Sequence, residues 1–197
     1  MMKHVRYEAI RASMQCAIGC LLMLCALVAQ AQSAPAPSAA TSSKTVLVMG
    51  DSLSAGYGMA ADQGWVGLLE QRLQREAPGW RVVNGSISGE TSAGGASRIV
   101  QVVVRERPAA VVIALGANDG LRGLPLAEAR RNLARMIGAS QHVGAQVLLV
   151  GMRMPPNLGT EYTRGFEANY RLLADTFDVA LLPFLLEPIA TDRAHFQ

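Results

Sequence analysis

The residues best suited to chemistry lie in short polar segments that each follow an apolar stretch. Ser52 lies in the first, Gly50-Asp51-Ser52-Leu53-Ser54. A serine in a turn after a buried strand can present its hydroxyl to a cleft, and the N-terminus of a following helix favours developing negative charge. Asp and Ser are also residue types that cap helices. This segment alone leaves a catalytic and a purely structural interpretation open.

The second and third segments offer hydrogen-bond donors. Gly89 has no side chain, so its amide can approach a substrate oxygen, although a loop glycine can also serve only its backbone angles. Asn118 has an amide that can donate two hydrogen bonds, although Asn-Asp-Gly at 118–120 also suits an ordinary turn. Hydrolysis of an ester passes through a tetrahedral oxyanion, and losing one donor costs on the order of 100- to 1,000-fold in rate. Together, the Ser52 and Gly89 amides and the Asn118 side chain predict an oxyanion hole.

An alternation of strands and helices must position these segments. Continuous apolar strands separated by helices indicate βαβ units, which form a parallel sheet covered on both faces. Ligands of such sheets bind beyond the carboxyl ends of the strands, where the polar segments fall. Apolar runs predict strands at 45–49, 81–84, 110–115, 146–150 and 179–182, and helical spacing predicts helices at 65–76, 92–107, 126–142 and 161–177.

Longer motifs surround the three segments. They are Gly50-Asp-Ser-Leu-Ser-Ala-Gly-Tyr57, Asn84-Gly-Ser-Ile-Ser-Gly-Glu-Thr91 and Asn118-Asp-Gly-Leu-Arg-Gly123, continued by Met154-Pro-Pro-Asn157 and Leu182-Pro-Phe184. In order and spacing they resemble the SGNH (GDSL) hydrolases, most closely the bacterial periplasmic branch of thioesterases, lysophospholipases and arylesterases. The resemblance covers about residues 45–190. It implies an α/β fold of three layers (α/β/α), with a five-stranded parallel sheet of the flavodoxin-like kind.

The resemblance also implies an activity and a set of site residues. Ser52 would be the nucleophile, and Gly89 and Asn118 would be oxyanion donors, in hydrolysis of fatty acyl esters or thioesters through an acyl-enzyme. Loops at 121–123 and 152–158 would line an acyl-chain groove, although ordinary core packing is the alternative for the methionines. We therefore expect substrate contacts from Asp51, Leu121, Arg122, Met154 and Pro155.

The catalytic base is the component that the sequence does not supply in the family's form. In that family an Asp-x-x-His-Pro block precedes the final helix, and the chain up to Gln197 has no such block. Serine is a poor nucleophile without a base, so we expect an incomplete C-terminus, with the block beyond Gln197 and the final helix missing. Asp192 and His195 have the right separation, but they follow the fifth strand too closely, so a surface helix turn is favoured. His142 is expected at a helix end on the side opposite the site.

The N-terminal region has the pattern of a cleaved signal peptide. Positive charges precede an uncharged apolar run at 14–29, and Ala29-Gln30-Ala31 supplies the small-x-small pattern of a cleavage site. An uncleaved anchor is the alternative, although the run is shorter than the roughly 20 residues that span a bilayer. All three cysteines lie in this region, so the mature protein would have no disulfide. We expect a signal peptide at 1–31, a flexible linker at 32–43, a hydrolase domain at 44–197, and a periplasmic or secreted location.

Charge and motifs argue against several other functions. Without the leader residues Lys3, Arg6, Arg11 and Glu8, 15 basic and 14 acidic residues remain, so the net charge falls from +3 to +1 and leaves no nucleic-acid footprint. No metal-ligand cluster is seen, so we expect no metal, no cofactor, a small-molecule acyl substrate and a monomer.

Three rival functions can be weighed from the sequence. Residues 56–61 fit a loose G-x-G-x-x-A dinucleotide pattern, but the glycines come late after the strand and Asn84 stands where a ribose-binding acid is expected. The alternatives that stay open are a carbohydrate O-acetyl esterase on the same fold and a catalytically inactive acyl-binding module.

Overall fold

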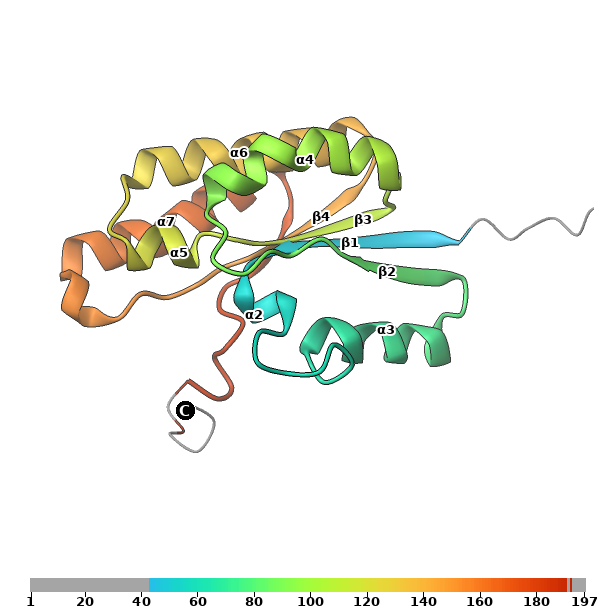
Figure 1. The fold of residues 1–197 in the computed structure, drawn as a ribbon. Helices are drawn as coiled ribbons and strands as arrows, with labels where there is room; N and C mark the ends of the chain where they lie inside the picture. Colours follow the sequence, from blue (N-terminus) through green and yellow to red (C-terminus); the bar gives the residue numbers. More distant parts are fainter. Residues whose placement is uncertain (1–42, 191, 193–197) are drawn as a thin grey trace, which may run out of the picture. The chain divides into compact units, whose positions relative to one another are not determined.

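A parallel sheet of five strands lies at the centre of the computed structural model (Figure 1). The strand order is β2-β1-β3-β4-β5, which is the order of flavodoxin-like sheets, the kind that the family resemblance implies. The structure describes residues 43–190 and 192, so the predicted signal peptide and nearly all of the linker lie outside it. The strands are β1 (Lys44–Gly50), β2 (Trp80–Asn84), β3 (Ala110–Ala114), β4 (Gln146–Val150) and β5 (Ala180–Leu182).

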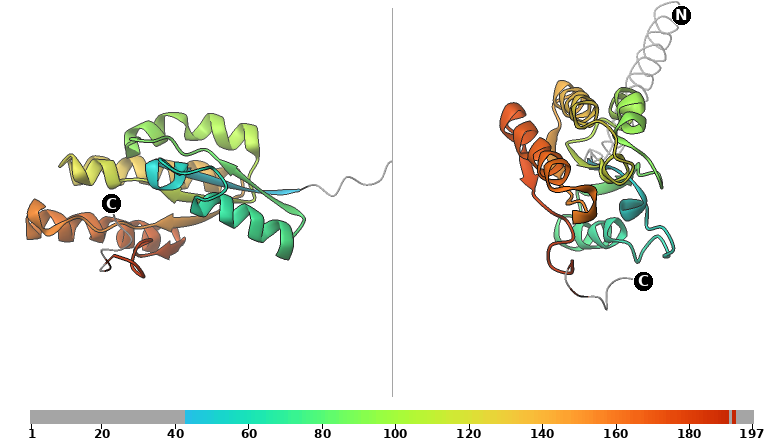
Figure 2. Two further views of the ribbon diagram at one scale, coloured as in Figure 1. Left: turned by 60° about the horizontal axis from the view of Figure 1, so that its bottom comes forward. Right: turned by 90° about the vertical axis from the view of Figure 1, so that its left-hand side faces the viewer.

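Helices cover both faces of this sheet. Figures 1 and 2 show α4, α6 and α7 on one face and α3 on the other. Among the described residues, no helix is both long and apolar enough to cross a bilayer. The helices are α2 (Ser52–Ala55), α3 (Trp65–Glu76), α4 (Ser92–Glu106), α5 (Ala117–Leu121), α6 (Leu126–His142) and α7 (Thr160–Phe177), with a 3-10 turn η1 (Pro156–Leu158) before α7.

The alternation of side chains along β1 explains why both faces need cover. Leu47 and Met49 are buried in the larger core, beneath α4, α6 and α7. Val46 and Val48 are buried in the smaller core, together with Val66 of α3. Because successive side chains of a strand point to opposite faces, one apolar run supplies both cores.

The predicted long elements are confirmed to within one residue at each end. Helix α4 ends at Glu106 rather than at 107, because Arg107 adopts a left-handed conformation with φ of 44°. Two short helices, α2 and α5, were not predicted. With four and five residues, they are too short to show a helical period.

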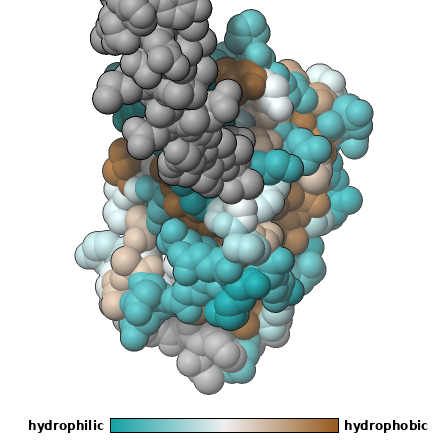
Figure 3. All heavy atoms as spheres, turned by 90° about the vertical axis from the view of Figure 1, so that its right-hand side faces the viewer, coloured by the Kyte–Doolittle hydropathy of each residue, from teal (hydrophilic) through white to brown (hydrophobic). Residues whose placement is uncertain are grey.

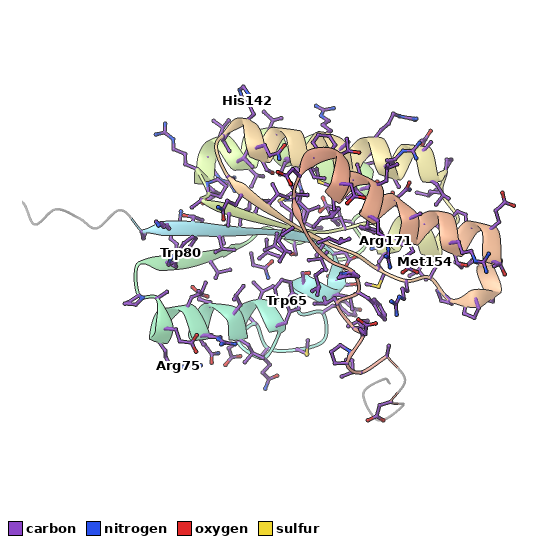
Figure 4. The ribbon with its side chains drawn as sticks, turned by 180° about the vertical axis from the view of Figure 1, so that it is seen from behind. Trp65, Arg75, Trp80, His142, Met154 and Arg171 are labelled. Carbon is purple, nitrogen blue, oxygen red and sulfur yellow. The ribbon has the colours of Figure 1, made fainter. Side chains whose placement is uncertain are left out.

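The two ends of the sheet differ in the residues that lie there. The loops after β1, β2 and β3 all emerge at the carboxyl end of the strands. At the opposite end, the part of the surface that is visible in Figure 3 is largely hydrophilic. His142 ends α6 just before β4 begins, so it lies at this amino end, as predicted (Figure 4).

Candidate active site

Ser52 is the first residue of α2, directly beyond the carboxyl end of β1. Asp51 caps this short helix, since its Oδ1 accepts a hydrogen bond from the Leu53 amide at 3.1 Å. Gly56, in a left-handed conformation, ends the helix after one turn. Ser52 is half-buried and lines a pocket of about 260 Å³. The capping interpretation therefore applies to Asp51, and it leaves Ser52 facing a cavity.

Gly89 lies in the loop after β2, which is fastened to the loop after β1. The Ile87 amide donates to the Gly50 carbonyl at 3.0 Å, one residue before Asp51. Gly89 has a φ of +78°, a conformation that favours glycine. The backbone therefore gives a structural reason for a glycine at this position, whether or not its amide binds substrate. Within the part of the chain that the structure describes, neither the Gly89 amide nor the Ser52 amide donates a hydrogen bond to protein. Two unpaired backbone donors are thus available in these two loops.

Asn118 joins those two loops. Its Nδ2 donates to Asp51 Oδ2 at 3.2 Å and to the Glu90 carbonyl at 3.0 Å. Asn118 lies in α5, which begins after Gly116, where φ is +115° and a Cβ would collide with the Tyr170 hydroxyl. The structure therefore brings the segments of Ser52, Gly89 and Asn118 together at one edge of the sheet.

The Asp51 carboxyl carries the main electrostatic perturbation near Ser52. It is 2% exposed, and burial raises its pKa above the ordinary value. Hydrogen bonds from the Leu53 amide and the Asn118 side chain oppose this shift, and the negative charge of Glu90 adds to it. Burial outweighs the hydrogen bonds, so Asp51 is a more basic carboxylate than one in water.

Four of the five predicted substrate contacts line the same pocket as Ser52. These are Asp51, Leu121, Met154 and Pro155. Arg122 does not line it, because its Nη2 donates to the Gly89 carbonyl at 3.1 Å. The pocket is also lined by Ser52, Leu53, Ala117, Asn118, Met152, Arg153 and Leu186.

Both interpretations offered for the methionines hold for Met154. Met154 is 9% exposed and belongs to the larger core, yet it also forms part of the pocket wall. In Figure 4 it lies below α7, on the side away from His142. Leu186 was missed, because its segment after β5 has no period that would signal a pocket wall.

A base for Ser52 is not found among the described residues. His142 is the one histidine within residues 43–190 and 192, and it lies at the opposite end of the sheet. His195 lies outside the described residues, and Asp192 is exposed. Within the described ranges, no three His, Cys, Asp or Glu side chains gather to hold a metal ion.

The sequence also matches a known family of hydrolases. The sequence profile of the GDSL-like Lipase/Acylhydrolase family matches residues 48–197. The chain therefore belongs to that family, as its motifs predict.

Relatives from three bacteria share this sequence over most of their length. Esterase TesA of Pseudomonas aeruginosa is 47% identical over 91% of this chain and 84% of its own length. An arylesterase of Vibrio mimicus is 42% identical, over 78% and 77% respectively. Thioesterase 1/protease 1/lysophospholipase L1 of Escherichia coli is 40% identical, over 76% and 71%.

Solved structures confirm the fold. The crystal structure of TesA superimposes with a TM-score of 0.76 at 47% identity, covering 78% of this chain and 86% of that one. AlinE4, an esterase of the SGNH-hydrolase family, gives 0.75 at 40% identity, covering 79% and 83%. The three-layer α/β/α architecture is thus that of the SGNH hydrolases.

Proposed function

We propose that this protein hydrolyses carboxylic esters or thioesters of fatty acyl groups, with Ser52 as the nucleophile. The observation that carries the proposal is the position of Asn118, whose amide is hydrogen-bonded to Asp51 on one side and to Glu90 on the other. Each partner is adjacent in the chain to a residue with an unpaired amide, Ser52 or Gly89. The relatives named esterase, arylesterase and thioesterase support the same reaction class.

In the proposed reaction, Ser52 Oγ attacks the acyl carbonyl carbon and its proton passes to a histidine base. The oxyanion that forms accepts hydrogen bonds from the Ser52 amide, the Gly89 amide and Asn118 Nδ2. Asn118 keeps its hydrogen bond to the Glu90 carbonyl, and the Nδ2–H that it donates to Asp51 Oδ2, over the longer distance of 3.2 Å, turns to the oxyanion. The alcohol or thiol leaves with a proton from the base, and water then releases the fatty acid from Ser52.

The base in this mechanism comes from outside the described residues. His142 is unsuitable, because it lies at the amino end of the strands and Ser52 lies at their carboxyl end. The two candidates for this base are a histidine in an Asp-x-x-His-Pro block beyond Gln197 and His195 within this chain. Sequencing the gene past codon 197 separates the two: an Asp-x-x-His-Pro block there supports the first, and a stop codon refutes it.

Covalent labelling tests the proposed nucleophile directly. A fluorophosphonate probe should add once per chain and map to the peptide that contains Ser52, and the Ser52→Ala variant should stay unlabelled. Ser54→Ala is a matched control, since Ser54 lies two residues away in the same short helix and does not line the pocket. A full-length, folded chain that hydrolyses no ester and never labels would favour an inactive acyl-binding module.

The residues of the pocket wall indicate which acyl groups the pocket would accept. Five of its eleven residues are leucine or methionine, namely Leu53, Leu121, Met152, Met154 and Leu186, and Ala117 and Pro155 are also apolar. An apolar wall favours medium and long acyl chains over acetyl. A series of p-nitrophenyl esters of increasing chain length tests this, because acceptance of acetyl alone would favour a carbohydrate O-acetyl esterase.

We also propose export to the periplasm or the medium, through the N-terminal signal peptide that lies outside the described residues. Its support is the charged start, the apolar run at 14–29 and the Ala29-Gln30-Ala31 motif. N-terminal sequencing of the mature protein should begin at Gln32. A mature chain that retains residues 1–31 would instead indicate an uncleaved anchor.

A further inference from the structure

A second set of buried polar residues lies next to the proposed oxyanion donors. Ser92 begins α4 and is fully buried, and Asp119 lies in α5 and is 3% exposed. The Asp119 carboxylate accepts two hydrogen bonds from Ser92: one from its amide at 2.7 Å and one from its hydroxyl at 2.5 Å. Asn132 of α6 donates to the Ser92 hydroxyl oxygen at 3.1 Å. One serine thus connects α4, α5 and α6.

The hydrogen bonds that stabilise the buried Asp119 carboxylate come from α4. Among the described residues, no Lys, Arg or His forms an ion pair with this carboxylate. A buried carboxylate without a cation is costly unless donors surround it. The donors here are both on Ser92, at the N-terminus of α4, where the helix dipole also favours a negative charge. Asp119 is therefore held to the first residue of α4 rather than to a cation.

This contact is adjacent to the contact that Asn118 makes. Asn118 and Asp119 are consecutive in α5, and their partners, Glu90 and Ser92, are two residues apart in the segment that leads into α4. Consecutive helical residues point about 100° apart, so fixing the direction of Asp119 also fixes the direction of Asn118. Helix α5 has only five residues, so its own hydrogen bonds do little to set its rotation.

We propose that Asp119 and Ser92 are positioning residues for the hydrolysis. Their hydrogen bonds hold α5 against the N-terminus of α4 and thereby set the separation between the Asn118 amide and the Gly89 amide. Neither residue lines the pocket, so neither is expected to touch the substrate. The inference rests on the proposed function of Asn118 and Gly89 as oxyanion donors.

A matched pair of serine variants tests the proposal in the full chain. Ser140, like Ser92, is a fully buried helical serine, but its hydroxyl donates only to the Met136 carbonyl of its own helix. Ser92→Ala should lower kcat for a p-nitrophenyl ester by about tenfold or more and change KM by less than about twofold. Ser140→Ala should leave both constants within about twofold of wild type, because it lies far from the donors.

A spectroscopic readout separates positioning from general destabilisation. In nitrogen-15 NMR spectra, Ser92→Ala should shift the signals of the Asn118 side-chain amide and the Gly89 backbone amide, and Ser140→Ala should leave them in place. Asp119→Asn keeps the side-chain size and one acceptor but loses the charge, so we expect smaller shifts of the same signals.

Two outcomes would overturn the proposal. One is a folded Ser92→Ala variant with unchanged kcat and unmoved Asn118 and Gly89 signals. The other is an equal loss of kcat in Ser92→Ala and Ser140→Ala, which would point to stability alone. A wild-type protein that neither hydrolyses esters nor labels at Ser52 would instead refute the proposed function, and the NMR comparison would still decide the positioning role.

Discussion

Arg98 of α4 holds Glu90 with two parallel hydrogen bonds, from Nε to Oε1 at 2.7 Å and from Nη2 to Oε2 at 2.5 Å. The Glu90 side chain is 7% exposed and that of Arg98 is 21% exposed, so the pair is largely shielded from water. Arg98 also donates to the Gly85 carbonyl at 2.6 Å. A single guanidinium therefore fixes both ends of the loop that contains Gly89.

Removal of this guanidinium should destabilise the protein. In Arg98→Met, Glu90 keeps a mostly buried charge without its partner, so the free energy of unfolding should fall by about 2 to 3 kcal/mol. Arg72→Met is the matched control, because the Arg72–Glu76 pair is exposed on α3 and should contribute at most about 0.5 kcal/mol. Urea denaturation measures both variants, and equal losses would contradict the role given to Arg98.

Truncation of Asn118 should affect the chemical step more than substrate binding. Asn118→Ala removes one proposed oxyanion donor, so kcat should fall by about 100- to 1,000-fold with a smaller change in KM. Steady-state kinetics with a p-nitrophenyl ester measure this. A rise in KM with unchanged kcat would show instead that Asn118 serves ground-state binding.

Alanine should lower the stability of the fold at Gly89, where φ is positive, and raise it at Gly138, which lies in a helix. At both Gly89 and Gly138 a Cβ would meet no atom within 4 Å, so packing does not distinguish them. Gly89→Ala forces alanine into φ of +78° and should destabilise the fold by about 1 kcal/mol. Gly138→Ala lies inside α6, four residues before its end, and should stabilise it by about 0.5 to 1 kcal/mol. Thermal or urea unfolding would contradict this argument if both changes had the same sign.

The buried Asp51 carboxyl should make stability depend on pH in a defined direction. Burial raises its pKa in the folded state above the ordinary value of 3.8, so the folded state binds this proton more tightly than the unfolded state does. The contribution of Asp51 to stability therefore falls as pH rises from the unfolded pKa through the folded pKa. Asp51→Asn removes this titration and keeps a residue type that can cap α2.

Urea denaturation of both proteins at about pH 4 and about pH 7 tests the direction. The free energy of unfolding of wild type, relative to Asp51→Asn, should be lower at the higher pH. A relative gain at the higher pH would mean that the hydrogen bonds from Leu53 and Asn118 outweigh burial.

The long helices and strands could be predicted because helix-breaking residues and apolar patterns mark their ends in the sequence. Helix α3 ends at Glu76, just before Ala77-Pro78-Gly79, and α6 keeps its apolar face from Leu126 to His142. The three loops of the site were also predictable, since parallel strands bring their carboxyl ends to one edge. Contacts that depend on how elements pack were not predictable. Arg122 turns to the Gly89 carbonyl instead of the pocket, and Leu186 reaches the pocket from beyond β5.

The proposed nucleophile and oxyanion donors lie on one half of the sheet, and part of the pocket wall comes from the other half. The proposed nucleophile and oxyanion donors follow β1, β2 and β3, on one half, whereas Met152–Pro155 and Leu186 follow β4 and β5, on the other. The Met152–Pro155 segment takes no part in the hydrogen bonds among Asp51, Glu90 and Asn118, so it can be exchanged for that of a relative without removing any of them. Chimaeras of this one segment would change the wall that the acyl chain meets while the proposed nucleophile and oxyanion donors kept their own sequence.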